Sequence, residues 1–390
     1  MTTSFKYPVL LLGAGKIGWA IARLLAGTGE YDVLVGDMDE PALARLEASA
    51  DVRTVRLNVT DPVALRNAIT GRRAVLSACS FDVNPGIASA ALADGASYFD
   101  LTEDVATTRI IRQLAERAVP GQIFMPQCGL APGFVSIAAH HLTLGFDKLD
   151  ELRLRVGALP QFPTNEMKYN LTWSTDGLIN EYGNPCEAIH RGKLIEVLPL
   201  EGLEHFSLDG IDYEAFNTSG GVGTLCDTLD GKLRSLNYKT IRYRGHRDLI
   251  AFLMNDLRLN DRRHLLKDIL ENAVPVTPQD VVLIFCTVSG WRDGRLTQVT
   301  DARKIYHSSC PVPGRADTHP AERWSAIQLT TASSLCAVLD LHVAGRLPAS
   351  GFVRQEQVSL PDFLANRFGK CYATDATSMS ISRAEGTAVA

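Results

Sequence analysis

Residues 9–18 read Val-Leu-Leu-Leu-Gly-Ala-Gly-Lys-Ile-Gly, and this stretch decides the fold. An apolar run that ends in G-x-G-x-x-G predicts a strand, a glycine turn and the start of a helix. A second apolar run, residues 31–36, ends at Asp37. The order strand, glycine turn, helix, strand, acid is the fingerprint of a dinucleotide-binding unit.

Each part of this fingerprint has a physical role. Gly13 permits the tight turn, Gly15 lets the backbone approach a pyrophosphate, and Gly18 lets the helix pack closely on the strand. The helix start presents free N–H groups to the phosphates. We expect the Asp37 carboxylate to bind the adenosine ribose and to repel a 2′-phosphate, for which Met38 offers no compensating cation. The sequence therefore predicts NAD, with NADP disfavoured.

Strands and helices alternate through residues 1–130. The remaining strand signals of this part lie at 53–57, 74–79, 98–102 and 123–126, and the helical ones at 62–69, 85–94 and 105–118. This rhythm predicts a doubly wound parallel (Rossmann) sheet with right-handed crossovers. The fold class is therefore α/β.

The pattern changes after residue 133. Strand-like runs at 151–156, 194–197, 239–243 and 281–288, with a helical block at 249–272, predict a second α/β domain on a mixed or antiparallel sheet. An apolar helix at 330–344 is expected to return to the first domain. We predict a dinucleotide-binding domain (1–130) completed by helices in 322–375, a substrate-binding and dimerisation domain (131–321) and a disordered tail (376–390).

The composition narrows the function classes. A net charge of −5 gives no reason to expect nucleic-acid or membrane binding. No apolar run reaches transmembrane length, and the N-terminus lacks a signal-peptide pattern. The eight cysteines are scattered without metal-ligand spacing, so we expect no metal, reduced thiols and a cytoplasmic location.

In doubly wound sheets, ligands bind at the carboxyl ends of the strands. The residues expected to bind the cofactor there are Gly13, Gly15, Lys16, Ile17, Gly18, Asp37, Met38, Asn58, Val59, Cys79, Ser80 and Cys128. Hydride transfer needs no nucleophile, so we interpret Cys128 as a packing residue near the nicotinamide.

Further blocks carry a more specific signal than the glycine turn. They are Y-F-D-L-T-E-D (98–104), C-G-L-A-P-G (128–133), Y-N-L-T-W-S (169–174), G-L-I-N-E-Y (177–182), A-F-N-T-S-G-G (215–221) and N-Y-K-T-I-R-Y (237–243). With them the chain resembles the saccharopine dehydrogenase family, particularly its bacterial lysine 6-dehydrogenase-like branch. The resemblance covers residues 8–375. It implies a split first domain, a second α/β domain, a homodimer and hydride exchange at a carbon–nitrogen bond of an amino acid.

An amine-oxidising site has definite needs. The amine must lose a proton, because a free lysine amine has a pKa of about 10.4. The substrate carboxylate needs a cationic clamp, for which Arg242 is our candidate. Asp100 and Glu103 are candidates for the proton acceptor or for binding an ammonium group, and we assign these two and Arg242 as catalytic. One acid of the 100–104 segment is expected to cap the helix that starts near Val105.

Other residues have both a functional and a structural interpretation. Asn217 and Thr218 precede a glycine pair and either bind substrate or form a turn. Trp173 is either a pocket wall or a core aromatic residue. His246 either shuttles a proton near the substrate or lies on the surface.

The leading hypothesis is an NAD-dependent oxidoreductase of lysine metabolism that deaminates lysine oxidatively to the semialdehyde. The alternative enzyme is a saccharopine-type dehydrogenase, which makes or cleaves a secondary amine between lysine and a keto acid or glutamate. It needs a second cationic clamp, for which Lys168, Lys239 and Arg244 are candidates. A hypothesis of another class is a non-catalytic NAD-binding sensor.

Overall fold

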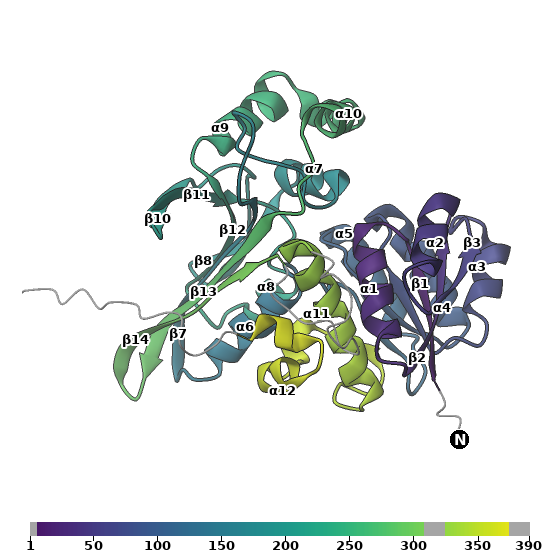
Figure 1. The fold of residues 1–390 in the computed structure, drawn as a ribbon. Coiled ribbons are helices and arrows are strands. Elements are labelled where there is room, and N and C mark those ends of the chain that lie inside the picture. Colours follow the sequence, from purple (N-terminus) through teal and green to yellow (C-terminus); the bar gives the residue numbers. More distant parts are fainter. Residues whose placement is uncertain (1–5, 308–323, 374–390) are drawn as a thin grey trace, which may run out of the picture.

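The computed structural model describes residues 6–307 and 324–373, which build two sheets (Figure 1). The first sheet has the order β15-β6-β5-β4-β1-β2-β3, and all its pairings are parallel. Its strands are β1 (Tyr7–Leu12), β2 (Tyr31–Asp37), β3 (Arg53–Arg56), β4 (Ala74–Ser77), β5 (Ser97–Asp100), β6 (Ile123–Met125) and β15 (Gly351–Phe352).

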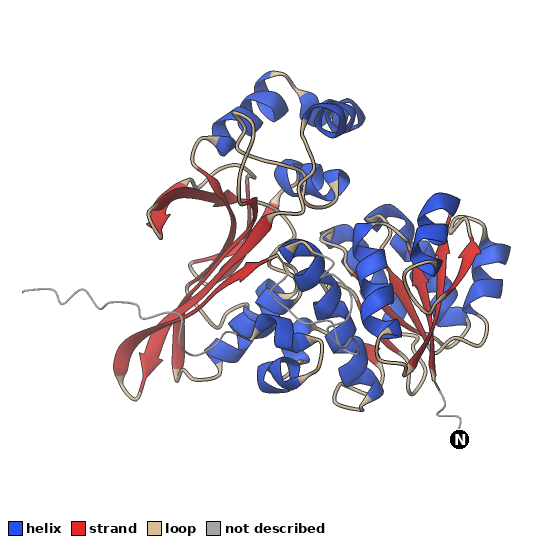
Figure 2. Ribbon diagram, viewed as in Figure 1, coloured by secondary structure: helices blue, strands red, loops and turns tan. Residues whose placement is uncertain are grey.

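Helices cover both faces of this sheet (Figure 2). Side chains alternate across a strand, so Val9 and Leu11 join one core cluster while Leu10 and Leu12 join another on the opposite face. The helices of this part are α1 (Lys16–Ala26), α2 (Glu40–Glu47), α3 (Pro62–Ile69), α4 (Asn84–Ala93) and α5 (Val105–Ala115), with a short 3-10 turn at Phe81–Val83. The predicted Rossmann sheet is confirmed.

Segments from the end of the chain pack on this first unit. Helix α11 (Ala326–Val343) lies against α1, and the rings of Trp19 and Trp324 are 5.2 Å apart. Strand β15 joins the sheet beside β6. Among the described helices, α11 has the length and apolar composition to cross a membrane, but 72% of that window is buried inside the protein. The shorter elements that follow are α12 (Leu360–Ala365) and 3-10 turns at Gln355–Gln357 and Gly369–Tyr372.

The second sheet is mixed, as predicted. Its path is β10-β11-β12-β7-β13-β14, with β8 and β9 attached to β12. Only the β12–β7 pairing is parallel among the described strands of this sheet. Its strands are β7 (Lys148–Pro160), β8 (Cys186–His190), β9 (Lys193–Val197), β10 (Glu204–Leu208), β11 (Ile211–Asn217), β12 (Ser235–Tyr243), β13 (Asp280–Arg292) and β14 (Arg295–Tyr306).

The sequence pattern missed several elements of this half. Strands β8, β10, β11 and β14 were not predicted. Strands β10 and β14 are mostly exposed or half-buried, which weakens their apolar signal. Strands β8 and β11 are largely buried, and the alternation of apolar and polar residues at 211–215 was a strand signal that the sequence analysis did not use. The single helical block expected at 249–272 is divided into α9 (His246–Ala251), a π-helical turn (Phe252–Asp256), a 3-10 turn (Leu259–Arg262) and α10 (Arg263–Ala273). The remaining helices are α6 (Phe134–Thr143), α7 (Thr175–Gly183) and α8 (Leu225–Leu229).

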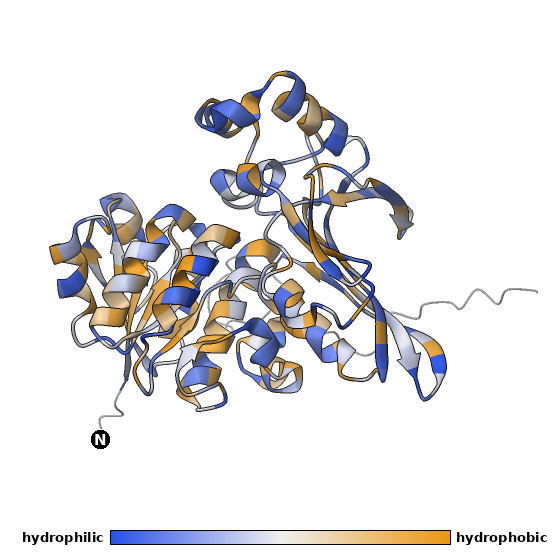
Figure 3. Ribbon diagram, turned by 180° about the vertical axis from the view of Figure 1, so that it is seen from behind, coloured by the Kyte–Doolittle hydropathy of each residue, from blue (hydrophilic) through white to orange (hydrophobic). Residues whose placement is uncertain are grey.

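Hydrophobic residues recur along the strands of both sheets (Figure 3). Of the cysteines in the described ranges, six are free, but Cys371 is disulfide-bonded, contrary to the expectation of reduced thiols. The tail predicted at 376–390 lies outside the described residues.

Candidate active site between the two sheets

A pocket lies between the carboxyl ends of the first sheet and one face of the second. From the first unit it is lined by Ile17, Cys79, Ser80 and Glu103. From the second it is lined by side chains of α7 and β12, including Glu181 and Arg242. Residues far apart in the sequence therefore form one cavity that begins beside the glycine turn.

The glycine turn has the shape of a phosphate cradle. Gly13 has a φ of +98°, and a Cβ at Gly18 would collide with the carbonyl of Gly13. A Cβ at Gly15 would meet nothing within 4 Å, so open space lies beside the backbone at the N-terminus of α1. Backbone N–H groups and the helix dipole at such a place favour an anion. The turn therefore fits the pyrophosphate of a dinucleotide.

Asp37 stands at the end of β2 with a fixed carboxylate. Its Oδ2 accepts from the N–H of Ala14 at 2.6 Å, and its Oδ1 accepts from the N–H of Asp39 at 2.9 Å. Each oxygen keeps a lone pair for a ligand hydroxyl. Arg56 is the register partner of Asp37 on β3 and forms an exposed ion pair of 3.2 Å with Glu40.

The other predicted cofactor residues surround this cradle. Met38 is 59% exposed, and Lys16 is exposed with its carbonyl accepting from Gln328 at 3.2 Å. Asn58 and Val59 follow β3, beside the end of β2.

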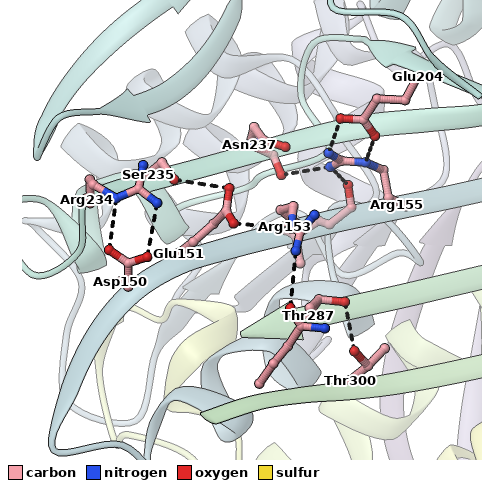
Figure 4. A network of polar contacts seen from close by, with 12 residues as sticks. Asp150, Glu151, Arg153, Arg155, Glu204, Arg234, Ser235, Asn237, Thr287 and Thr300 are labelled. Carbon is pink, nitrogen blue, oxygen red and sulfur yellow. Dashed lines mark hydrogen bonds and ion pairs between the residues drawn. The ribbon is translucent and has the colours of Figure 1, made fainter. Parts of the chain in front are cut away.

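Strand β12 divides its side chains between two environments. Tyr238, Thr240 and Arg242 line the pocket. Asn237 and Lys239 point to the opposite face, where Figure 4 shows a polar network around Arg155 and Glu204. This is the period-two alternation of a strand.

Lys239 is therefore not part of the pocket, which corrects the expectation that it binds substrate. Its ammonium group pairs with Glu204 at 2.6 Å and also contacts the carbonyl of Gly202. Lys168 and Arg244, the other two candidates for a second cationic clamp, do not line the pocket either. Lys168 donates to the carbonyl of Arg244 at 2.9 Å on the surface.

Arg242 is 2% exposed and held on two of its three nitrogens. Nε donates to the hydroxyl of Tyr182 at 2.8 Å. Nη1 donates to Thr240 at 2.8 Å and to the carbonyl of Ile241 at 2.9 Å. Nη2 makes no hydrogen bond to a described residue, and the side chain lines the pocket. It is therefore free to bind a ligand carboxylate, the role predicted for Arg242.

Three carboxyl groups line the pocket with Arg242, and two of them, Glu103 and Glu181, have raised pKa values. Burial raises the pKa of Glu103 to about 7. The side-chain amide of Asn180 donates a hydrogen bond to the Glu103 carboxylate at 3.3 Å, which acts to lower this pKa. Burial raises the pKa of Glu181 to about 8, while Arg242 acts to lower it and Glu103 to raise it. Both acids of this pair therefore have pKa values near neutral pH. A carboxyl group with such a pKa is suited to accepting a proton from a bound amine.

Glycines of the second unit allow Glu103 to enter this site. Gly220 has a φ of +82°, and a Cβ there would collide with the carbonyl of Glu103. A Cβ at Gly177 would collide with the ring of Trp173 and lie 3.4 Å from the Glu103 carboxyl. The motif blocks that surround these glycines therefore meet at one residue of the first unit.

Asp100 lies outside the pocket, which corrects its assignment as a catalytic residue. It is fully buried and accepts from the Tyr98 hydroxyl and from the N–H groups of Thr102 and Gln127, at 2.9–3.0 Å. Burial raises its pKa to about 6. These bonds hold together the loops after β5 and β6. The helix cap among the three acids is Asp104, which accepts from the N–H of Thr107 at 2.7 Å.

Cys128 is also separated from the pocket. It is fully buried, and its thiol donates to the carbonyl of Met125 at 2.9 Å. Cys128 is therefore a packing residue, as expected, but it does not line the cavity.

The remaining candidates lie at different depths. Trp173 lines the pocket. Asn217 faces away from it and donates to the carbonyl of Leu198 at 3.2 Å. Thr218 is buried but does not line the cavity, and its hydroxyl has no partner among the described residues. His246 is buried behind Tyr182 rather than in the pocket or on the surface.

Sequence reasoning missed Glu181 and Tyr238. Glu181 lies in the G-L-I-N-E-Y block, where it is the one charged residue, and that charge was the available signal. Tyr238 precedes Arg242 by four positions on one strand, so the alternation that places Arg242 in the pocket also places Tyr238 there. Among the described residues, no group of three or more His, Cys, Asp or Glu side chains could hold a metal ion.

Two family models match the chain. Residues 9–124 match the saccharopine dehydrogenase NADP binding domain, and residues 129–370 match the saccharopine dehydrogenase C-terminal domain. A saccharopine dehydrogenase (NADP(+), L-glutamate-forming) of Schizosaccharomyces pombe is 23% identical over 201 residues, covering 48% of this chain and 43% of that protein. The mitochondrial alpha-aminoadipic semialdehyde synthase of Rattus norvegicus is 20% identical over 261 residues, covering 61% and 28%. The chain thus spans less than half the length of both curated relatives.

Solved structures show the same fold. An apo saccharopine dehydrogenase (L-Glu forming) from Saccharomyces cerevisiae has a TM-score of 0.71 at 16% identity, over 94% of this chain and 96% of that one. A homospermidine synthase from Legionella pneumophila, solved in complex with NAD, has a TM-score of 0.64 at 13% identity, over 94% and 90%. Residues 9–124 are a nucleotide-cofactor-binding domain.

Proposed function

Since the chain belongs to the saccharopine dehydrogenase family, we propose that it is an oxidoreductase acting on the CH–NH group of an amino acid, with lysine as substrate and NAD as cofactor. The observation that carries this proposal is the charge content of the pocket. Arg242 is the one basic side chain among the described residues that line it, whereas Glu103, Asp176 and Glu181 are acidic. Asp176 pairs with Lys267 at 2.6 Å, which leaves two acids and one cation for a ligand.

These charges favour a ligand with one carboxylate and two amines. Arg242 binds the carboxylate, and the acid pair receives the amine end. A secondary amine that joins lysine to glutamate carries three carboxylates, and two of them would lack a cation here. The charge content therefore supports lysine deamination over the saccharopine-type alternative.

The residues of the pocket have distinct tasks in this reaction. Glu103 or Glu181 takes a proton from the substrate ammonium group, so that the nitrogen lone pair is free to form an iminium as hydride leaves the carbon. Water then hydrolyses the iminium to an aldehyde and ammonia. The bound nicotinamide supplies the hydride acceptor. Ile17, Leu130 and Trp173 line the cavity with apolar surface, which limits access of water.

Asp37 supports NAD as the cofactor. Its carboxylate is fixed by two backbone N–H groups and repels a 2′-phosphate. The family model and the relative from Schizosaccharomyces pombe are described with NADP, and Arg56 is the register partner of Asp37. Comparison of NAD with NADP therefore tests the role of Asp37.

The test is turnover of lysine with NAD and with NADP, followed by absorbance of the reduced cofactor and by ammonia release. We expect lysine to give ammonia and Arg242→Met to abolish the activity. Arg244→Met is the matched control, because this exposed arginine does not line the pocket. Glutamate release from saccharopine without ammonia from lysine would contradict the proposal. Inactivity on lysine, saccharopine and related diamines with both cofactors would favour a non-catalytic sensor.

A further inference from the structure

A continuous chain of hydrogen bonds runs from Arg242 away from the pocket. The Nε of Arg242 is 2.8 Å from the hydroxyl of Tyr182, and that hydroxyl is 3.0 Å from Nε2 of His246. Nδ1 of His246 is 2.8 Å from the carbonyl of Met167. Tyr182 and His246 are both buried, so water does not compete for these bonds.

The partners at the two ends fix the direction of every bond. A carbonyl only accepts, so Nδ1 of His246 carries the proton and Nε2 has the lone pair. The Tyr182 hydroxyl therefore donates to Nε2. Its oxygen then accepts from the Nε–H of Arg242, because a guanidinium only donates.

His246 is unsuited to proton transfer. Burial and the neighbouring Arg242 lower its pKa to about 3, so the ring stays neutral. Its other neighbours are the rings of Tyr169, Tyr182 and Phe216, with centroids 5.3–6.4 Å away. The ring does not line the pocket.

In the Arg242 guanidinium, Nη2 is the one nitrogen without a hydrogen bond to a described residue. Tyr182 holds Nε, and Thr240 and the carbonyl of Ile241 hold Nη1, which fixes the plane of the Arg242 fork. We propose that His246 is a positioning residue that acts through Tyr182 to aim Nη2 of Arg242 at the carboxylate of the substrate. This inference rests on the proposed function only in taking the ligand to be an amino acid.

The test compares two ligands that differ in the carboxylate. Lysine has it, and pentane-1,5-diamine has the same amines without it. We expect His246→Phe to raise the KM for lysine about ten-fold or more, because a hydrogen bond to a charged group is weakened. The KM for the diamine and the pH profile of kcat should not change. His264→Phe, at an exposed position of α10, is the matched control.

A milder variant keeps the test decisive if His246→Phe does not fold. Tyr182→Phe removes a single oxygen from the chain and should give the same carboxylate-specific rise in KM. The double variant should have the same KM for lysine as Tyr182→Phe alone, because both changes break the same chain of hydrogen bonds, which we call the relay. Additive effects, equal losses for both ligands, or a changed pH profile would each overturn the proposal.

Failure of the proposed function is separable from failure of this inference. Calorimetry measures the binding of lysine and of pentane-1,5-diamine to the cofactor-loaded protein without turnover. If the protein is inactive on lysine but prefers the carboxylate ligand in a manner that depends on His246, the relay stands and the proposed reaction is wrong. If the protein turns over lysine and His246→Phe leaves the carboxylate preference unchanged, the relay is wrong.

Discussion

At the scale of single residues, the site depends on carboxyl groups that are buried, where their ionised form is disfavoured. Glu181 is 6% exposed, and its carboxyl makes no hydrogen bond to a described residue. Transfer of a carboxyl group out of water disfavours its charged form, so the pKa rises toward the pH at which the protein works. A group of this kind in a cleft is typical of an acid–base role.

Substitution of Glu181 tests that role. Glu181→Gln keeps the size of the side chain but cannot accept the proton, so we expect kcat with lysine to fall about 10²-fold or more. In the wild type, kcat/KM should rise with pH through about 7 to 8 as the acid pair ionises. Asp176→Asn, at the pocket wall but paired with Lys267, is the control. Equal effects of the two variants would contradict the assignment.

Asp37 gives a second prediction at this scale. Asp37→Ser removes the negative charge beside the ribose site while Arg56 remains next to it. We expect the ratio of the Kd for NAD to the Kd for NADP to rise about ten-fold or more, since repulsion of the 2′-phosphate is lost. Calorimetry with each cofactor measures this ratio. An unchanged ratio would show that Asp37 does not set the preference.

At the scale of elements, local pattern predicts strands better than it predicts their partners. The run at 239–243 indicated a strand, and its alternation already separates Arg242 from Lys239. Nothing in the sequence told which face meets the cofactor, because that depends on the pairing of β12 with β7 and β11. Glycine positions were visible, but the close approach of Gly220 to Glu103 joins residues more than 100 positions apart.

The glycine turn before α8 offers a test of that contact. Gly220→Ala and Gly210→Ala both place a Cβ at a positive φ, which costs about 1–2 kcal/mol in each. Only Gly220→Ala also meets the backbone of Glu103, whereas a Cβ at Gly210 meets nothing within 4 Å. We expect Gly220→Ala to lower the free energy of unfolding by about 1–3 kcal/mol more than its control. Denaturant titration checks this, and equal losses would refute the contact.

At the scale of the whole molecule, the first sheet was predictable and the active site was predictable only in part. The glycine fingerprint and Asp37 are local, so their geometry follows from sequence. Asp100 and Glu103 come from one strand end, and no local pattern separates the buried structural acid from the one that enters the pocket. That distinction arises from the second sheet and its helices, which supply Asn180 and Glu181.

Glu103 and Glu181 are buried where the two sheets meet, so the free energy of unfolding depends on pH. In the folded protein the pKa values of Glu103 and Glu181 are raised to about 7 and about 8, whereas an unfolded glutamate titrates near about 4.3. The folded state then binds more protons, so its stability falls as pH rises through the interval between these values. Each group contributes up to about 1.4 kcal/mol per pH unit within that interval.

We therefore expect the free energy of unfolding to decrease from about pH 6.5, above which the buried neutral His246 no longer acts in the opposite sense, to about pH 8, and Glu181→Gln to reduce the slope. Glu196→Gln, on the exposed strand β9, is the matched control. Denaturant titrations across this range measure the slope for each variant. A bound diamine should also flatten it, because a cationic amine favours the ionised acids. Equal slopes in the wild type and Glu181→Gln would mean that burial does not raise the pKa of Glu181 toward neutral pH, and the assignment of Glu181 as a proton acceptor would lose its physical basis.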